Sequence, residues 1–206
     1  MSAVVNDQLF ISVFVTLVVI MDPLGTLPVF LALTATAERA ERIRAARQAV
    51  AVALAVIVLF AVFGQGVLGY LHVTLPALQG AGGLLLLLIA LELLTDRSDT
   101  EPVRTEGVNI AFVPLGTPLL AGPGAIVATM VFVNRIHTWA DAVAVALGVL
   151  AVHLVLYLTM RFGGLFLRLL GRNGVSLVTR ISGLLLSAIA VQLVADSVTA
   201  FVRAAS

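Results

Sequence analysis

A single carboxylate stands in the middle of a long apolar run. Asp22 lies near the centre of an apolar stretch from about residue 9 to residue 34, where a charged side chain costs about 2.5–3.5 kcal/mol on membrane-insertion scales. A buried acid of this kind can contact a substrate ammonium or carry a proton. It can equally cap a new half-helix that has Pro23 at its first position. Both interpretations stay open on the sequence, and they are compatible.

The residues around Asp22 interrupt any regular helix. The stretch Met21-Asp22-Pro23-Leu24-Gly25-Thr26-Leu27-Pro28 contains two prolines, which remove backbone donors and disfavour helix in the residue before them. A break at membrane depth is tolerated only where it is buried in protein or lines a wet cavity. We therefore predict that residues 9–34 form a membrane span with a break at its centre.

A second interruption echoes the first. The string Pro-Leu-Gly-Thr at residues 23–26 recurs at 114–117, inside the apolar run 108–133, and Ala121-Gly122-Pro123-Gly124-Ala125-Ile126 follows at once. Two broken spans in corresponding positions of two halves indicate a transport site. The candidate substrate-binding residues are those of the two breaks: Asp22, Pro23, Gly25, Thr26, Pro28, Pro114, Gly116, Thr117, Gly122, Pro123 and Gly124.

Most of these candidates would act through the backbone. The start of a half-helix presents free N–H donors and the positive end of a dipole, which suits a carboxylate. The end of the preceding half-helix presents free carbonyls, which suit an ammonium or a cation. A site with both would hold a small zwitterion. In the alternative interpretation the four glycines serve close helix packing, and the two threonine hydroxyls bond to a carbonyl one turn earlier.

Composition places the chain in a membrane. Its 206 residues are 61% hydrophobic and 11% charged, with a mean hydropathy of +1.14, whereas soluble domains are about 45–50% apolar and 25% charged. The apolar runs are continuous, which favours helices over an outer-membrane barrel. The absence of cysteine excludes thiol redox chemistry and cysteine-ligated metals. Neither metal-ligand spacing nor a catalytic triad, P-loop or dinucleotide turn is present, so we expect no enzyme, no cofactor and no metal.

Six spans are predicted, three in each half of a single domain over residues 1–206. Most arginines fall in the links after the first, third and fifth spans, so the positive-inside rule puts these links in the cytoplasm and both termini outside. Because each half (1–96 and 107–206) has an odd number of spans, the halves are inverted. The expected fold is all-α and integral to the membrane, with six transmembrane helices as an inverted 3+3 repeat and spans 1 and 4 broken. The spans are 9–34, 48–70, 77–95, 108–134, 139–160 and 180–202.

Other polar residues in the spans are weaker candidates. His153 lies well inside span 5, where it relays protons or bonds to a neighbouring backbone group. Glu92 and Asp96 share a helix face at the solvated end of span 3, and Gln192 and Asp196 do so near the outer end of span 6. The basic links are too short to indicate a nucleic-acid partner.

The two interrupted stretches resemble family motifs. Asp22-Pro23-Leu24-Gly25-Thr26-Leu27-Pro28-Val29-Phe30 resembles the Asn-Pro-(Ile/Leu)-Gly-x-x-Pro-x-Phe motif of the MarC family of bacterial and archaeal inner-membrane proteins, with Asp22 where the family more often has Asn. Residues 114–126 are similar to its second motif, which ends in Gly-Pro-Gly-(Ala/Ser)-Ile. The resemblance covers nearly the whole chain. It implies kinship with small exporters of the LysE type and with neutral amino acid transporters, and a pocket lined by both motifs.

The expected function is therefore secondary transport in a bacterial inner membrane. The substrate would be a small neutral amino acid such as glycine or alanine, exported or exchanged, with H⁺ or Na⁺ as the coupling ion. Two alternatives stay open, namely efflux of another small metabolite or drug and a non-transport role in membrane assembly. The partners are then a small molecule and the lipid bilayer, and a homo-oligomer is compatible with the sequence.

Overall fold

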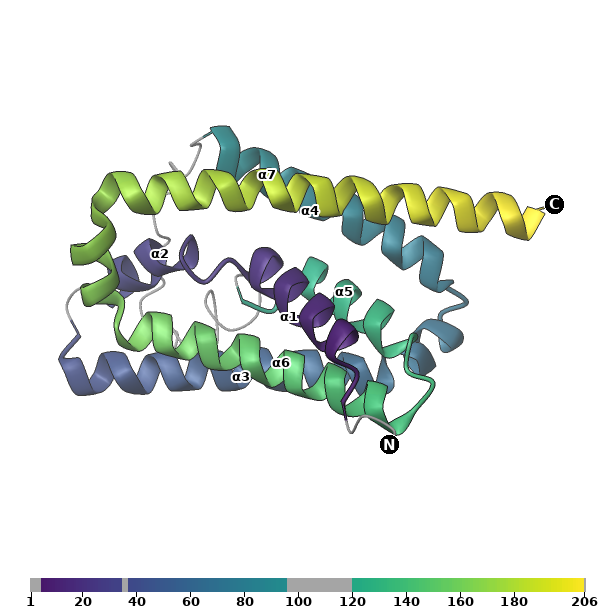
Figure 1. Cartoon of the computed structure of the whole chain (residues 1–206), viewed down its shortest axis with the longest axis horizontal. Coiled ribbons are helices and arrows are strands. Elements are labelled where there is room, and N and C mark those ends of the chain that lie inside the picture. Colours follow the sequence, from purple (N-terminus) through teal and green to yellow (C-terminus); the bar gives the residue numbers. More distant parts are fainter. Residues whose placement is uncertain (1–4, 35–36, 96–119, 206) are drawn as a thin grey trace.

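The computed structural model describes residues 5–34, 37–95 and 120–205, and its regular elements in these ranges are all α-helices (Figure 1). In chain order these are α1 (Asp7–Met21), α2 (Thr26–Leu33), α3 (Arg39–Tyr70), α4 (Leu75–Thr95), α5 (Pro123–Val133), α6 (Trp139–Arg161) and α7 (Gly163–Ala205).

Four helices in the described ranges are long and apolar enough to cross a bilayer. They are α3, α4, α6 and the part of α7 from Ser176 to Ala204, and they cover the predicted spans 48–70, 77–95, 139–160 and 180–202. Helix α3 begins earlier than its predicted span because Glu38 and Glu41 form a capping box ahead of the charged first turns. Its 32 residues give a length of about 48 Å, which exceeds the roughly 30 Å of a hydrocarbon core.

The predicted span 9–34 is two helices, α1 and α2, separated by the turn 22–25. The predicted break is confirmed, but two details of it are wrong. Helix α2 begins at Thr26, so Pro23 lies in the turn and not at the first helical position. Pro28 is the third residue of α2, where a missing N–H has no intrahelical partner to lose, so it does not break the helix.

The second interruption is described only from residue 120 onward. Gly122 is the N-cap of α5 and Pro123 its first residue, as expected for a half-helix that starts at a break. The predicted positions Pro114, Gly116 and Thr117 lie outside the described residues. The six-span count and the inverted repeat stay predictions.

Helices α1 and α6 run parallel, and a hydrogen bond joins their amino-terminal ends. Asn6 caps α1 by accepting the Leu9 N–H (3.1 Å), and its side-chain amide donates to Asp141 of α6 at 2.8 Å. About two turns further on, Gly148 of α6 packs against Val13 of α1. Around this pair, α3 packs on α5 and α6, and α1 also contacts α5 and α7. The starts of α1 and α6 therefore mark the same end of the bundle.

Helices α4 and α7 meet through a reciprocal close contact. A Cβ on Gly83 would lie 2.8 Å from the Ala190 carbonyl oxygen, and one on Gly183 would lie 3.3 Å from the Ala90 carbonyl oxygen. Small residues of this kind let membrane helices approach closely. The sequences match: Gly-Leu-Leu-Leu-x-x-Ile-Ala-x-x-Leu spans 83–93 and again 183–193, a separation of 100 residues against 91 for the Pro-Leu-Gly-Thr strings.

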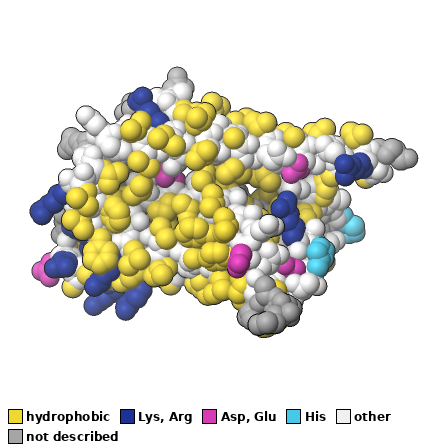
Figure 2. All heavy atoms as spheres, viewed as in Figure 1, with side chains coloured by type: hydrophobic (Ala, Val, Ile, Leu, Met, Phe, Trp, Pro, Cys, Tyr) yellow, Lys and Arg dark blue, Asp and Glu magenta, His cyan; other side chains and the backbone are white. Residues whose placement is uncertain are grey.

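The outer surface of the helices is largely apolar. Large hydrophobic side chains such as Phe63, Leu88, Leu154 and Leu184 are more than half exposed. Figure 2 shows hydrophobic side chains over the middle of the visible face, with arginines gathered toward the ends. Because a soluble monomer rarely exposes contiguous apolar patches of this extent, this surface faces lipid.

Candidate functional site

Asp22 ends α1 and opens the turn that leads to α2. Its backbone is left-handed (φ 37°, ψ 73°), a conformation that Asp and Asn tolerate better than other non-glycine residues. Its N–H donates to the Val18 carbonyl, and its own carbonyl accepts the Thr26 N–H, each at 3.0 Å. The Asp22 carboxylate Oδ1 accepts the Gly25 N–H at 3.1 Å. The carboxylate therefore caps a backbone N–H of the turn, but Asp22 itself is the C-cap of α1 and not the residue before the first turn of α2, because α2 begins only at Thr26.

The cap uses only one oxygen of the carboxylate. Asp22 is 7% exposed, and its Oδ2 has no hydrogen-bond partner in the described part of the chain. Ser182 of α7 is close enough for its side chain to interact with this carboxylate, although the approach does not meet hydrogen-bond geometry. A buried acceptor left in this state carries a desolvation cost, so a ligand cation or a proton would stabilise it.

The other residues of the first break shape the turn around Asp22. Pro23 is buried, and Gly25 is required because a side chain there would collide with the Asp22 carboxyl group. The Thr26 hydroxyl donates to the Pro23 carbonyl at 3.2 Å, as in the alternative interpretation of this residue. The hydroxyl proton of Thr26 is therefore already used in a backbone hydrogen bond and is not free to bind a substrate.

The second break offers a helix start. The Gly122 carbonyl accepts the N–H groups of Ala125 (3.0 Å) and Ile126 (3.2 Å), and Pro123 beside it is exposed. Gly124 is buried, and a Cβ at that position would meet the side chain of Leu86 on α4. For Gly124 the packing interpretation is the one that the structure bears out.

The described parts of the two breaks belong to one buried cluster. Met21, just before Asp22, and Leu120 and Ala121, just before Gly122, are at most 2% exposed and share the larger apolar core. In Figure 1 the start of α5 lies beside the gap between α1 and α2, and α1 packs against α5. The residues that flank both interruptions therefore lie in this core.

The weaker polar candidates mostly have local partners. His153 Nδ1 lies 2.7 Å from the Val149 carbonyl oxygen, which confirms the backbone-bonded interpretation, while its Nε2 is buried without a partner among the described residues. Gln192 donates to Asp196 at 2.7 Å, and Glu92 is exposed. Asp96 lies outside the described residues. Within the described ranges no group of acidic, histidine or cysteine side chains could hold a metal ion.

Sequence reasoning missed Ser182 and Asp141. Nothing in the sequence around Ser182 indicates that α7 brings it to Asp22, because this proximity arises from helix packing. Asp141 accepts the Thr138 N–H while Thr138 accepts the Asp141 N–H. The spacing Thr-x-x-Asp ahead of an apolar run was a readable sign of this capping box.

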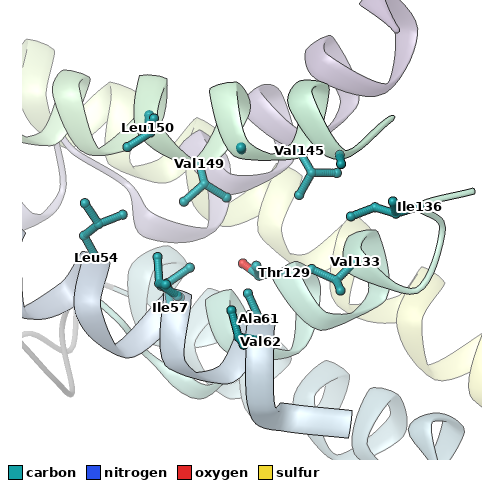
Figure 3. Close-up of a pocket in the computed structure, with 13 residues that line it drawn as sticks. Leu54, Ile57, Ala61, Val62, Thr129, Val133, Ile136, Val145, Val149 and Leu150 are labelled. Atoms are coloured by element: carbon teal, nitrogen blue, oxygen red, sulfur yellow. The ribbon is translucent and has the colours of Figure 1, made fainter. Parts of the chain in front are cut away.

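A groove of about 370 Å³ lies elsewhere, between α3, α5 and α6 (Figure 3). Its walls are aliphatic apart from Thr129, whose hydroxyl donates to the Ala125 carbonyl at 2.8 Å. A zwitterion would find no free polar group there. The groove contains none of the predicted site residues, so we do not place the amino acid site in it.

A chain whose described residues form helices alone, four of them long and apolar enough to span a bilayer, with an apolar outer surface and a buried acid at a helix break, is an integral membrane protein. The chain belongs to the MarC family: the model for MarC family integral membrane protein matches residues 7–202. No solved structure matches the chain.

Relatives match over almost their whole length. The UPF0056 membrane protein MJ1677 of Methanocaldococcus jannaschii is 38% identical, covering 93% of this chain and 96% of the relative. A UPF0056 membrane protein of Aquifex aeolicus is 34% identical over 91% of each chain. The UPF0056 inner membrane protein YhgN of Escherichia coli is 32% identical, covering 94% of this chain and 98% of the relative. These names describe membrane proteins and state no substrate.

Proposed function

We propose that this chain is a secondary transporter of small neutral amino acids, with its substrate site at the breaks before α2 and α5. One observation carries the proposal. The Asp22 carboxylate is 7% exposed at a helix break in the bundle core, and one of its oxygens has no hydrogen-bond partner in the described residues. Intramembrane acids of this kind face substrate or proton pathways.

The chemistry of the breaks suits a zwitterion. The Asp22 carboxylate would bind the substrate ammonium or exchange a proton with it, and the start of α5 would face the substrate carboxylate through its N–H groups. The groups packed against Gly25 and Gly124, which are the Asp22 carboxyl group and the Leu86 side chain, favour a substrate no larger than glycine or alanine. H⁺ or Na⁺ is the proposed coupling ion.

The helix packing supports an inverted repeat of six spans. When α1 is exchanged with α5, α3 with α6 and α4 with α7, the contacting pair α1–α6 maps onto α5–α3. The pair α1–α7 likewise maps onto α5–α4. The matched segments 83–93 and 183–193 face each other across the α4–α7 contact, as a two-fold relation between halves requires.

The proposed location is a bacterial inner membrane with both termini outside. The start of α3 and the junction of α6 with α7, which are rich in arginine, lie at one end of the bundle, and the starts of α1 and α6 lie at the other (Figure 1). The positive-inside rule assigns the arginine-rich end to the cytoplasm. The Escherichia coli relative is named as an inner membrane protein.

A second candidate function is efflux of a larger apolar molecule. The observation in its favour is the aliphatic groove of Figure 3. Its occupant would compete with lipid chains and would be unaffected by changes at Asp22. Transport of an apolar dye that persists in Asp22→Asn would favour this candidate over the amino acid site.

Uptake into proteoliposomes tests the main proposal. Labelled glycine, alanine and serine are supplied with and without a proton gradient, and in a parallel set with a sodium gradient. We expect flux of at least one of them in the wild-type protein, dependent on one gradient. A verified folded sample that moves none of the three, by gradient or by exchange, contradicts the proposal.

The Asp22→Asn substitution removes the negative charge and keeps the oxygen that accepts the Gly25 N–H. Asparagine keeps the left-handed backbone and an oxygen that accepts the Gly25 N–H, so the variant should fold while losing gradient dependence. Asp196→Asn is the matched control, because it removes a carboxylate that bonds Gln192 on an exposed surface. If Asp22→Asn transports with unchanged gradient dependence, Asp22 is a cap and not a proton carrier.

A further inference from the structure

Four arginines from three helices surround a groove at the end of the bundle where α3 begins and α6 ends. The groove has a volume of about 470 Å³. Arg39 and Arg42 come from the start of α3, Arg161 from the end of α6, and Arg168 from the start of α7. The remaining lining residues are mostly apolar: Ile43, Met160, Phe162, Gly164 and Leu165.

The positive charges of this groove are unpaired within the described ranges, where none of the four arginines forms an ion pair with a carboxylate. Arg42 donates to the Thr34 carbonyl at 3.4 Å, while its Nε is buried without a partner. Arg161 contacts the Tyr157 hydroxyl at 3.4 Å. The nearby acid Glu41 bonds to the Glu38 backbone N–H and does not line the groove.

Four guanidinium groups around one cavity favour a phosphate ligand. Arginine presents a planar fork of donors that matches phosphate oxygens in two-point contacts. Like charges held together without a counter-ion also repel each other, so a bound anion would stabilise the arrangement.

The apolar residues that line the groove favour a phospholipid over a soluble phosphate as the ligand. A soluble phosphate has nothing to place against Phe162 or Leu165, and Leu165 is 56% exposed. A phospholipid would place its headgroup phosphate among the arginines and its acyl chain along these apolar side chains. Basic pockets between transmembrane helices bind anionic lipids in this way.

We propose that this groove binds the phosphate-bearing headgroup of an anionic membrane phospholipid. The proposal does not depend on what the protein transports, because it rests on the membrane location and on the four arginines alone. The lipid would link the start of α3 to the α6–α7 junction.

Lipid titration of the purified full chain tests this site. The protein in neutral detergent is titrated with phosphatidylglycerol and, separately, with zwitterionic phosphatidylcholine, and bound lipids are counted by native mass spectrometry. We expect tighter binding of phosphatidylglycerol. Because each arginine near a lipid surface contributes about a fivefold factor, Arg161→Gln combined with Arg168→Gln should weaken that binding about 30-fold.

Two controls make the result specific. Arg135→Gln removes a charge that lies over the Phe132 ring near the start of α6, at the other end of the bundle, and should leave the binding unchanged. Arg161→Lys combined with Arg168→Lys keeps both charges and reports on folding, and should retain most of the binding. Equal binding of the two lipids, or an equal loss in Arg135→Gln, would overturn the proposal. Displacement of the lipid by millimolar inorganic phosphate would overturn the lipid as the ligand.

Discussion

The carboxyl group of Asp22 occupies the space that a side chain on residue 25 would need, with its Cγ 2.8 Å from the position of a Cβ there. Gly25 has no left-handed backbone angle, so its lack of a side chain matters for space and not for conformation. Asp22 and Gly25 are therefore one unit: the carboxylate accepts the Gly25 N–H at 3.1 Å because nothing stands between them.

This relationship predicts strong coupling between changes at the two positions. Gly25→Ala should displace the Asp22 carboxylate and lower the free energy of unfolding by about 1–3 kcal/mol, as overpacked sites do. In an Asp22→Ala background the same change should be nearly neutral. A double-mutant cycle by thermal unfolding in detergent measures the coupling. Additive effects would show that the two residues do not share the space.

The α4–α7 contact predicts a selective sensitivity to one added methyl group. Gly83→Ala would press on the Ala190 carbonyl, which cannot move aside as a side chain could, so we expect a loss of about 1–3 kcal/mol. Gly66→Ala in α3 is the matched control, since a Cβ there would meet nothing within 4 Å. That control should be neutral or stabilising, because alanine is the better helix former. Equal melting temperatures for the two variants would contradict the contact.

The hydrogen bond between α1 and α6 predicts different stabilities for two substitutions of Asn6. Asn6→Ser keeps an N-cap oxygen and loses only the amide that donates to Asp141. Asn6→Asp also keeps a cap, but it places a second carboxylate against Asp141. We expect Asn6→Asp to be the less stable variant at neutral pH. Its deficit should shrink as the pH is lowered, because protonating either acid restores a donor. A pH series of melting temperatures checks this, and a deficit independent of pH would contradict the prediction.

A substitution at Thr26 tests whether its hydroxyl stabilises the turn or binds the substrate. Because its hydroxyl donates to the Pro23 carbonyl, Thr26→Val should lower the free energy of unfolding by about 0.5–1.5 kcal/mol, the net worth of one hydrogen bond. The KM for the transported amino acid should stay unchanged. Uptake at several substrate concentrations measures it, and a raised KM in a stable Thr26→Val protein would show that the hydroxyl binds substrate.

Features set by local sequence could be predicted well. The break at Asp22 follows from Pro23 and the neighbouring polar groups, and its cap follows from an aspartate before a turn. The limits of α4 and α6 lie within two residues of the predicted spans because the flanking turns and charges mark them. Pro28 misled the prediction, since a proline in the first turn of a helix resembles a helix breaker in sequence alone.

Features that depend on packing could not be predicted in this way. Ser182 and Asp22 are neighbours only because α7 crosses α1. The repeat of 83–93 at 183–193 is hard to align with the Pro-Leu-Gly-Thr repeat because the two separations, 100 and 91 residues, differ by nine. A single shift cannot align all parts of the two halves, and only the facing glycines of α4 and α7 make the second match evident.

The bond between Asn6 and Asp141 joins residues 135 positions apart. At a synthesis rate of about 5–20 residues per second, roughly 7–27 s pass between the two residues leaving the ribosome. The first helix therefore leaves the ribosome before its partner, while α3, α4 and α5 are still being made. The α1–α6 contact closes late in biogenesis, so a chain interrupted before α6 would carry an α1 that has no partner at its amino end.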